Sequence, residues 1–435
     1  MWSIVFEQDP LDEPNNSVAG IDLSSCGSTI VKAKVNIKTL ISSMTDDSQS
    51  SDKFFVFEEG GRSARTTLAH LFSLAMADSC PYISDQIDGN TNTSQSVCLV
   101  AEPLYFMRRW KKITQQWRTK VELNGDPKAL NRSNIELKNP SRKLSDLFPP
   151  YIMERSDVWC DESSLNISLV VMIDRHQIEE RFDPTDKVKS FIVNFLDSIA
   201  SKVIKENCFL SHVANTLIQR KIRDLLTSLN AVAFIANGSI MPRKSGASFA
   251  PMSSPPAIPF VAPIDSNLTK QIKVKMGKLA PYVKNPNVIS SPQNSDEIFI
   301  NGMVIPKGVT IIVGGGYHGK STMLRAIMTG VYDKILGDGR ELCVTDAGAV
   351  TVRAEDGRYV NNTNVSAFIS NLPIIGSDTR HFSTREASGS TSQASNVADA
   401  IEMGASALLV DEDVSAANFM SRDGRMVSER RDQEH

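Results

Sequence analysis

Several features that would define a function at once are missing from this sequence. The six cysteines are scattered along 435 residues without a C-x-x-C pair or the set of cysteines and histidines that a zinc site requires. This usage predicts reduced thiols in an intracellular compartment. No run of about 18 apolar residues occurs and no targeting signal is evident at the N-terminus, so we expect a soluble protein without a membrane helix, with the cytoplasm as its expected location.

A strong net charge is also missing. The formal charge is -3 at pH 7, so the chain has no overall field that would attract nucleic acid or an anionic membrane. One local segment, residues 105–118, mixes cations with aromatic residues at roughly helical spacing. The favoured interpretation is a surface helix whose aromatic side chains face the core, and a nucleic-acid-binding patch is the alternative.

One segment matches a complete nucleotide-binding motif. Residues 314–321 read GGGYHGKS and fit G-x-x-x-x-G-K-[ST], and the apolar runs on both sides predict a preceding strand and a following helix. Unpaired amides and the helix dipole favour negative charge at such a helix start. The motif therefore predicts a phosphate-binding loop for a nucleoside triphosphate with Mg²⁺. A glycine-rich turn that binds nothing is the alternative.

The residue types of the loop suit this task. Glycines leave room for the backbone to curl around phosphate oxygens. Lys320 is predicted to reach the β- and γ-phosphates, and the Ser321 hydroxyl to bind magnesium. The predicted nucleotide contacts of the loop are Gly314, Gly315, Gly316, Tyr317, His318, Gly319, Lys320, Ser321 and Thr322.

A second motif follows at residues 407–413. The apolar run 407–410 predicts a buried parallel strand that ends in Asp411, Glu412 and Asp413. Asp411 is predicted to hold magnesium, directly or through water, and Glu412 to deprotonate the attacking water as a general base. The alternative is a strand that ends in a solvated acidic turn, and the upstream phosphate loop favours the catalytic interpretation.

The rest of the pattern predicts an α/β chain in three segments. We expect residues 1–160 to be an α+β region of undefined fold and partial disorder, 161–260 an α/β segment, and 261–435 the nucleotide-binding domain. The predicted strands are 167–173, 232–236, 297–305, 341–345 and 350–353, and the predicted amphipathic helix is 213–229. A further strand beginning at Val309 is expected to form a hairpin with 297–305.

Between the two motifs, Ser388, Gly389 and Ser390 open a predicted helix. A Ser-Gly start is a common cap, but its position between a phosphate loop and an Asp-Glu strand is informative, because this order of parts resembles the ABC ATPases. The phosphate loop, RAEDGR at 353–358, ASGSTSQA at 387–394 and DED at 411–413 are similar to a group of soluble predicted ATPases of the ABC class. The similarity covers about residues 210–425.

The resemblance implies a P-loop NTPase fold of ABC type, with a mixed sheet flanked by helices. It also implies a homodimer that sandwiches ATP and Mg²⁺, in which Ser388, Gly389 and Ser390 of one protomer contact the nucleotide on the phosphate loop of the other. Hydrolysis, with Lys320 and Glu412 as catalytic residues, would then drive a conformational cycle. A kinetoplastid member of the group is associated with mitochondrial RNA editing, which implies RNA as an alternative partner.

The chain departs from the ABC pattern at two points. No glutamine occurs between Ser321 and Gln393, and the sequence ends at His435, before the further strand and switch histidine that the resemblance implies. We therefore expect a domain truncated at its C-terminus. One alternative is a catalytically weak nucleotide-binding module that binds RNA or a protein partner. Another is a small-molecule kinase, which the Ser-Gly helix and the Asp-Glu pair fit less well.

Overall fold

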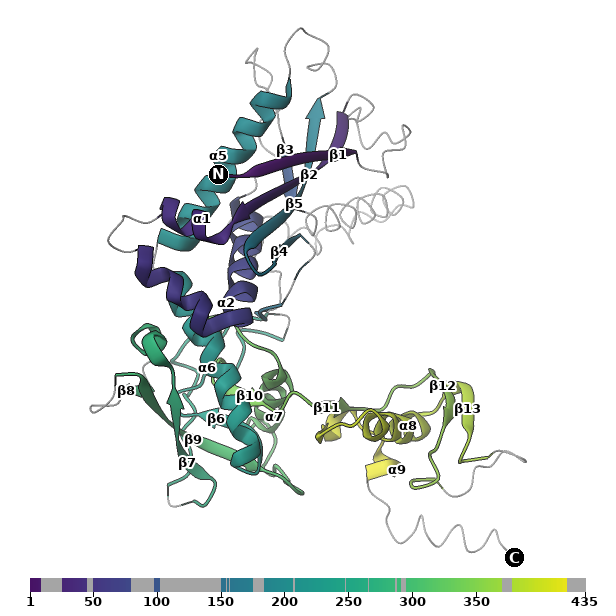
Figure 1. The fold of residues 1–435 in the computed structure, drawn as a ribbon. Coiled ribbons are helices and arrows are strands. Elements are labelled where there is room, and N and C mark those ends of the chain that lie inside the picture. The colour runs from purple at the N-terminus through teal and green to yellow at the C-terminus, as the bar shows by residue number, and fades with distance from the viewer. Residues whose placement is uncertain are drawn as a thin grey trace, which may run out of the picture. The chain divides into compact units, whose positions relative to one another are not determined.

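The computed structural model describes residues 1–8, 26–44, 50–79, 98–101, 150–153, 155, 157–174, 184–205, 208–246, 248–264, 266–285, 288–290, 295–369 and 378–420. The chain divides into two compact units: Met1–Leu217 with Met276–Lys284, and Ile218–Lys275 with Asn285–His435 (Figure 1). The predicted boundaries at 160 and 260 stay a prediction, because compactness does not establish which segments fold independently. The basic segment 105–118 and the terminal residues 430–435 lie outside the described residues.

The first unit contains an antiparallel sheet with helices packed against it (Figure 1). Its strand order is β1-β2-β5-β3, and β4 also pairs with β5. On β5, Leu165, Ile167 and Leu169 are fully buried while the residues between them are half-buried, as the two-residue period of a strand requires. The strands are β1 (Ser3–Gln8), β2 (Cys26–Asn36), β3 (Cys98–Ala101), β4 (Val158–Cys160) and β5 (Ser164–Asp174). The helices are α1 (Ile37–Met44), α2 (Ser50–Ser79), α5 (Pro184–Lys205) and the first half of α6 (Cys208–Ser228).

Two histidines are buried where α2 and α6 meet the rest of this unit. Both ring nitrogens of His70, and Nδ1 of His212, have no hydrogen-bond partner among the described residues. Burial lowers the pKa of His70 to about 4, with further contributions from the charges of Arg155 and His212. Burial, and then the charge of Lys284, lowers the pKa of His212 to about 4 as well. Both rings are therefore neutral in the folded protein at neutral pH.

These histidines predict a loss of stability on mild acidification. An unfolded histidine binds a proton as the pH falls through about 6.5, whereas the folded rings resist protonation until pH 4. Their contribution is fully present above pH 6.5, and at pH 5 its loss should cost about 2 kcal/mol per histidine. Denaturant unfolding at pH 7.5 and pH 5 measures the difference. His70→Phe, which keeps an aromatic ring but cannot titrate, should remove about half of it, and an unchanged pH dependence would contradict this explanation.

The second unit is built around a second antiparallel sheet with the order β10-β6-β9-β7, in which β8 also pairs with β9. β6 is buried along almost its whole length, so apolar side chains occupy both of its faces. Ile218, Ile222 and Leu226 form the buried stripe of α6, as their spacing predicts. The strands are β6 (Ala231–Ala236), β7 (Thr269–Lys275), β8 (Val288–Ser290), β9 (Glu297–Pro306) and β10 (Cys343–Thr345).

The predicted hairpin of 297–305 with a strand at Val309 is wrong. β9 forms as expected, but it pairs with β6, β7 and β8, while the described residues 309–313 adopt no strand. Val309, Ile311 and Val313 are instead largely exposed. A strand exists only where a neighbouring backbone supplies its hydrogen bonds, and no described strand pairs with this stretch. The apolar sequence of residues 309–313 does not show that a pairing strand is lacking.

The remaining elements follow the phosphate loop. β11 (Ala349–Val352) and β14 (Ala407–Val410) form a parallel pair, and β12 (Arg358–Thr363) pairs with β13 (Phe382–Ala387). The helices are α7 (Lys320–Met328), α8 (Gly389–Glu402) and α9 (Ala417–Met420). The parallel strand at 407–410 was expected to be buried, but its residues are only half-buried. Across the described part of the chain, none of the helices has both the length and the apolar character needed to cross a bilayer.

Candidate functional site

The glycine-rich loop forms an exposed turn that leads directly into α7. Tyr317 and Gly319 have φ values of 62° and 83°, in the left-handed region, which is why glycine suits position 319. Gly319 is the N-cap of α7, and no side chain caps the amides of the first turn. These amides and the helix dipole therefore form a site that favours an anion.

Lys320 folds back over the loop that precedes it. Its Nζ donates to the carbonyl oxygens of Gly314 at 2.6 Å and Gly315 at 2.8 Å. The ring of His318 lies so close to Gly315 that an added Cβ would stand 2.7 Å from His318 Nδ1, so a side chain at 315 would displace the imidazole. The ammonium is held at the open side of the loop, where phosphate oxygens can replace the carbonyls as acceptors.

The acidic end of β14 lies next to the start of α7. Asp411 is buried, and its carboxylate accepts from the Asp413 backbone amide at 3.4 Å. The hydroxyl of Ser321 donates to Asp413 Oδ2, also at 3.4 Å. Ser321 thus contacts Asp413, a carboxylate for which the sequence suggested no role. The run of three acidic residues was the only sequence signal for it. Glu412 is exposed at the same turn.

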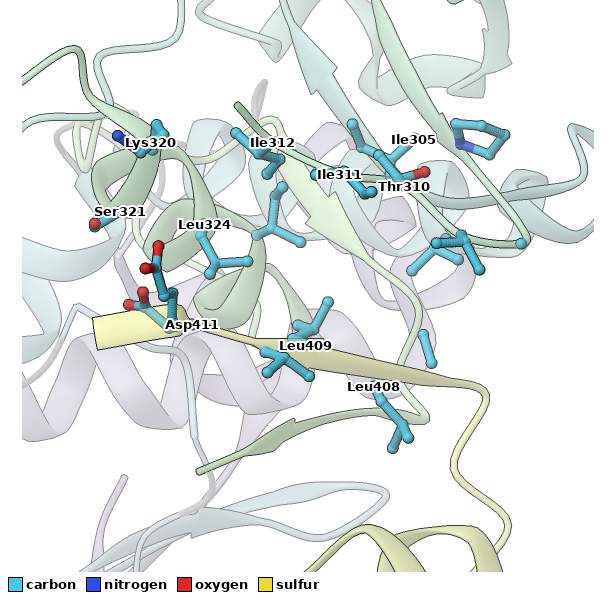
Figure 2. A pocket seen from close by; sticks show the side chains of 18 of the residues that line it. Ile305, Thr310, Ile311, Ile312, Lys320, Ser321, Leu324, Leu408, Leu409 and Asp411 are labelled. Carbon is cyan, nitrogen blue, oxygen red and sulfur yellow. The ribbon is translucent and has the colours of Figure 1, made fainter. Parts of the chain in front are cut away.

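A cavity of about 790 Å³ joins the two motifs. Its polar end is lined by Lys320, Ser321 and the acidic turn 411–413, and Figure 2 shows Asp411 directed toward the helix that carries Lys320 and Ser321. The rest of the cavity is a mainly apolar groove lined by residues 309–312 and by β14. The backbone of residues 309–313 pairs with no described strand, and this leaves the groove open. The cavity is of a size usual for small-molecule sites.

The segment that follows α7 is tied to α6 by buried and partly buried polar contacts. Asp333 receives Arg220 Nε at 2.6 Å and Arg223 Nη1 at 2.9 Å. The side-chain amide of Gln219 pairs with the backbone of Lys334, donating to its carbonyl at 2.9 Å and accepting from its amide at 2.8 Å. Because ion pairs that are joined by further hydrogen bonds resist rearrangement, these contacts fix the segment that follows α7.

Ser388, Gly389 and Ser390 lie at the start of α8, away from this cavity. Ser388 is the N-cap, and no side chain caps the first amides of this 14-residue helix. None of the three residues lines the cavity of the phosphate loop. The structure therefore brings Lys320, Ser321, Asp411 and Glu412 to one cavity. The Ser-Gly helix start is not part of that cavity, and Ser390 Oγ donates to Asn418 Oδ1 at 2.7 Å in the segment that follows the acidic turn.

The site has the parts of a P-loop nucleotide site. These are a left-handed glycine turn, a lysine and a serine on the first turn of a helix, and a neighbouring strand that ends in carboxylates. The family model for the P-loop domain of the ABC ATPases matches residues 205–434, more than half of the chain, and the chain belongs to this family. It therefore carries an α/β P-loop domain of the class that binds nucleotides.

One curated relative is similar to this chain. It is an uncharacterized protein of Methanocaldococcus jannaschii, 31% identical over 235 residues, which are 53% of this chain and 47% of the relative. The chain thus spans about half the length of that relative. The relative is described only as uncharacterized, so it assigns no activity to this chain.

Proposed function

We propose that the chain is an ATPase of ABC type that binds ATP between two protomers and uses hydrolysis to drive a conformational cycle. The observation that carries this proposal is the shared cavity of Lys320, Ser321, Asp411 and Glu412. These residues come from two segments about 90 positions apart, and their meeting places a cation and carboxylates around one space. A glycine-rich turn with no ligand would need no such partner.

The residues of the site divide the chemical tasks. The amides of the first turn of α7 and the ammonium of Lys320 bind the phosphates and offset the charge that develops as the terminal phosphoryl group is transferred. Glu412, exposed at the edge of the cavity, accepts the proton of the attacking water. Burial and the bond from the Asp413 amide hold Asp411 in place beside it.

The donor set fits magnesium. Ser321 and Asp411 would hold the ion, and all available donors at this point are hydroxyl or carboxylate oxygens, which Mg²⁺ prefers. The ion usually keeps few protein ligands because phosphates and waters complete its shell, so the arrangement needs no larger cluster. When bound, Mg²⁺ neutralises phosphate charge. Asp413, already in contact with Ser321, would orient that serine.

The dimer is supported by the two helix starts. The start of α7 lies at the cavity, whereas the start of α8 does not line it, although no side chain caps its first amides. A head-to-tail pair would bring Ser388, Gly389 and Ser390 of one protomer to the nucleotide of the other. The competing proposal is a catalytically weak nucleotide-binding module that binds RNA or a protein partner.

ATP turnover, measured together with sedimentation velocity, tests the proposed function. We expect phosphate release that requires Mg²⁺, and a shift toward dimer when ATP and Mg²⁺ are added together. ATP without Mg²⁺ is the control, because it should give neither. Tight ATP binding without phosphate release or dimer formation would contradict the proposal and favour the catalytically weak module.

A further inference from the structure

Gln393 is a buried polar residue that has no role in the reaction proposed above. It lies in the second turn of α8 and has no exposed surface. An amide side chain offers both donors and acceptors, and an unpaired one in this position would be costly. Its partners therefore show what the residue holds in place.

Both ends of the Gln393 amide contact the turn that follows the acidic motif. Oε1 accepts from the backbone amide of Ala416 at 2.8 Å, and Nε2 donates to Ser415 Oγ at 3.2 Å. Ser415 Oγ in turn donates to the carbonyl oxygen of Asp411 at 2.8 Å. A continuous chain of hydrogen bonds thus runs from α8 to the residue at the end of β14.

The turn between these points is short and internally bonded. Glu412–Val414 form a single 3₁₀ turn, in which the amide of Val414 donates to Asp411 O and the amide of Ser415 to Glu412 O. A displacement at Ser415 is therefore carried directly to the backbone of Asp411 and Glu412. The exposed Glu412 has little other packing to fix its direction.

We propose that Gln393 is a positioning residue, which through Ser415 fixes the acidic turn so that Glu412 is directed at the attacking water. This inference rests on the proposed ATPase function. Gln393 does not line the nucleotide cavity, so it acts through the turn and not on the substrate. The same helix, α8, begins with Ser388–Ser390. A ligand or partner bound at the start of α8 would therefore be linked to the acidic turn through this helix and Gln393.

Substitutions of Gln393 separate positioning from binding. Gln393→Met keeps the length of the side chain but removes its hydrogen bonds to Ala416 and Ser415 and the weak one to Met420 Sδ at 3.7 Å. Gln393→Glu keeps the acceptor for the Ala416 amide. We expect kcat to fall about 10- to 100-fold in Gln393→Met and less in Gln393→Glu, with KM for ATP changed by less than about threefold. Amide hydrogen exchange at Ala416 should become faster in Gln393→Met and stay slow in Gln393→Glu.

Ser415→Ala provides a second variant in case Gln393→Met does not fold. It should lower kcat in the same way, and the double variant should be no worse than the more impaired single variant, because both residues act along one path. Asn396→Ala is the matched control. It removes a side-chain hydrogen bond from the same helix, to the carbonyl of Arg353 at 2.8 Å, outside this path, and should leave kcat unchanged.

The outcomes distinguish this inference from the proposed function. If the wild-type protein hydrolyses ATP and folded Gln393→Met and Ser415→Ala variants retain its kcat, the positioning role is refuted and the ATPase stands. A rise in KM without a fall in kcat would also refute it, since that is loss of binding. If the wild-type protein releases no phosphate, the proposed function fails, and the role of Gln393 in it fails too.

Discussion

Lys320→Ala should weaken ATP binding by about 100-fold or more, because the ammonium would supply charge-assisted hydrogen bonds to the phosphates that a methyl side chain cannot supply. Lys320 lies over the loop, bonded to the carbonyls of Gly314 and Gly315. The cation is thus held beside the loop, next to the position that we propose for the phosphate oxygens. Isothermal titration calorimetry with ATP and Mg²⁺ measures the change.

Arg325→Ala is the control for Lys320→Ala. Arg325 is an exposed cation on the same helix and does not line the cavity, so its removal tests whether general positive charge explains the binding. We expect nearly unchanged affinity for this variant. If Lys320→Ala bound ATP as tightly as the wild-type protein, the nucleotide would have to bind elsewhere.

Glu412→Gln should lower kcat for ATP hydrolysis by about 10²- to 10⁴-fold while leaving ATP affinity nearly unchanged. The amide keeps the shape of the side chain but cannot accept the proton of the attacking water. Because ATP would still bind, the variant should also accumulate as the nucleotide-bound dimer. Phosphate release under single-turnover conditions, with sedimentation of the same samples, measures both effects.

Glu402→Gln supplies the matched control for this substitution. Glu402 is an exposed carboxylate at the end of α8, away from the cavity, so the same chemical change there should leave kcat unaltered. Equal phosphate release by Glu412→Gln and the wild-type protein would show that Glu412 is not the general base. The competing carboxylates of the turn, Asp411 and Asp413, would then have to be tested in its place.

Local sequence was sufficient to predict the elements whose causes are local. The apolar period of α6 and the Ser-Gly start of α8 appear at the expected residues, and so does the loop-to-helix transition at Gly319 and Lys320. The order of the motifs also sufficed to identify the family that the comparison shows. In each case the signal lies within a few residues of the structure that it predicts.

The errors and omissions all concern partners that are distant in sequence. Whether residues 309–313 form a strand depends on a neighbouring strand that supplies backbone hydrogen bonds. The apolar pattern of these residues does not show whether such a strand lies beside them. Which carboxylate contacts Ser321 depends on the path of a 3₁₀ turn, which brings Asp413 to that hydroxyl. The partners of Gln393 lie on the turn after β14, so its place in the network was likewise not visible in the sequence.

The central claim is that the phosphate loop and the end of β14 bind the two parts of one Mg²⁺–triphosphate group. A crystal structure of the protein with Mg²⁺ and a slowly hydrolysed ATP analogue tests it most directly. We predict the γ-phosphate within hydrogen-bond reach of Lys320 Nζ, and the metal at about 2.1 Å from Ser321 Oγ with Asp411 beside it. A bound nucleotide elsewhere, with Lys320 still bonded to the carbonyls of Gly314 and Gly315, would contradict the account.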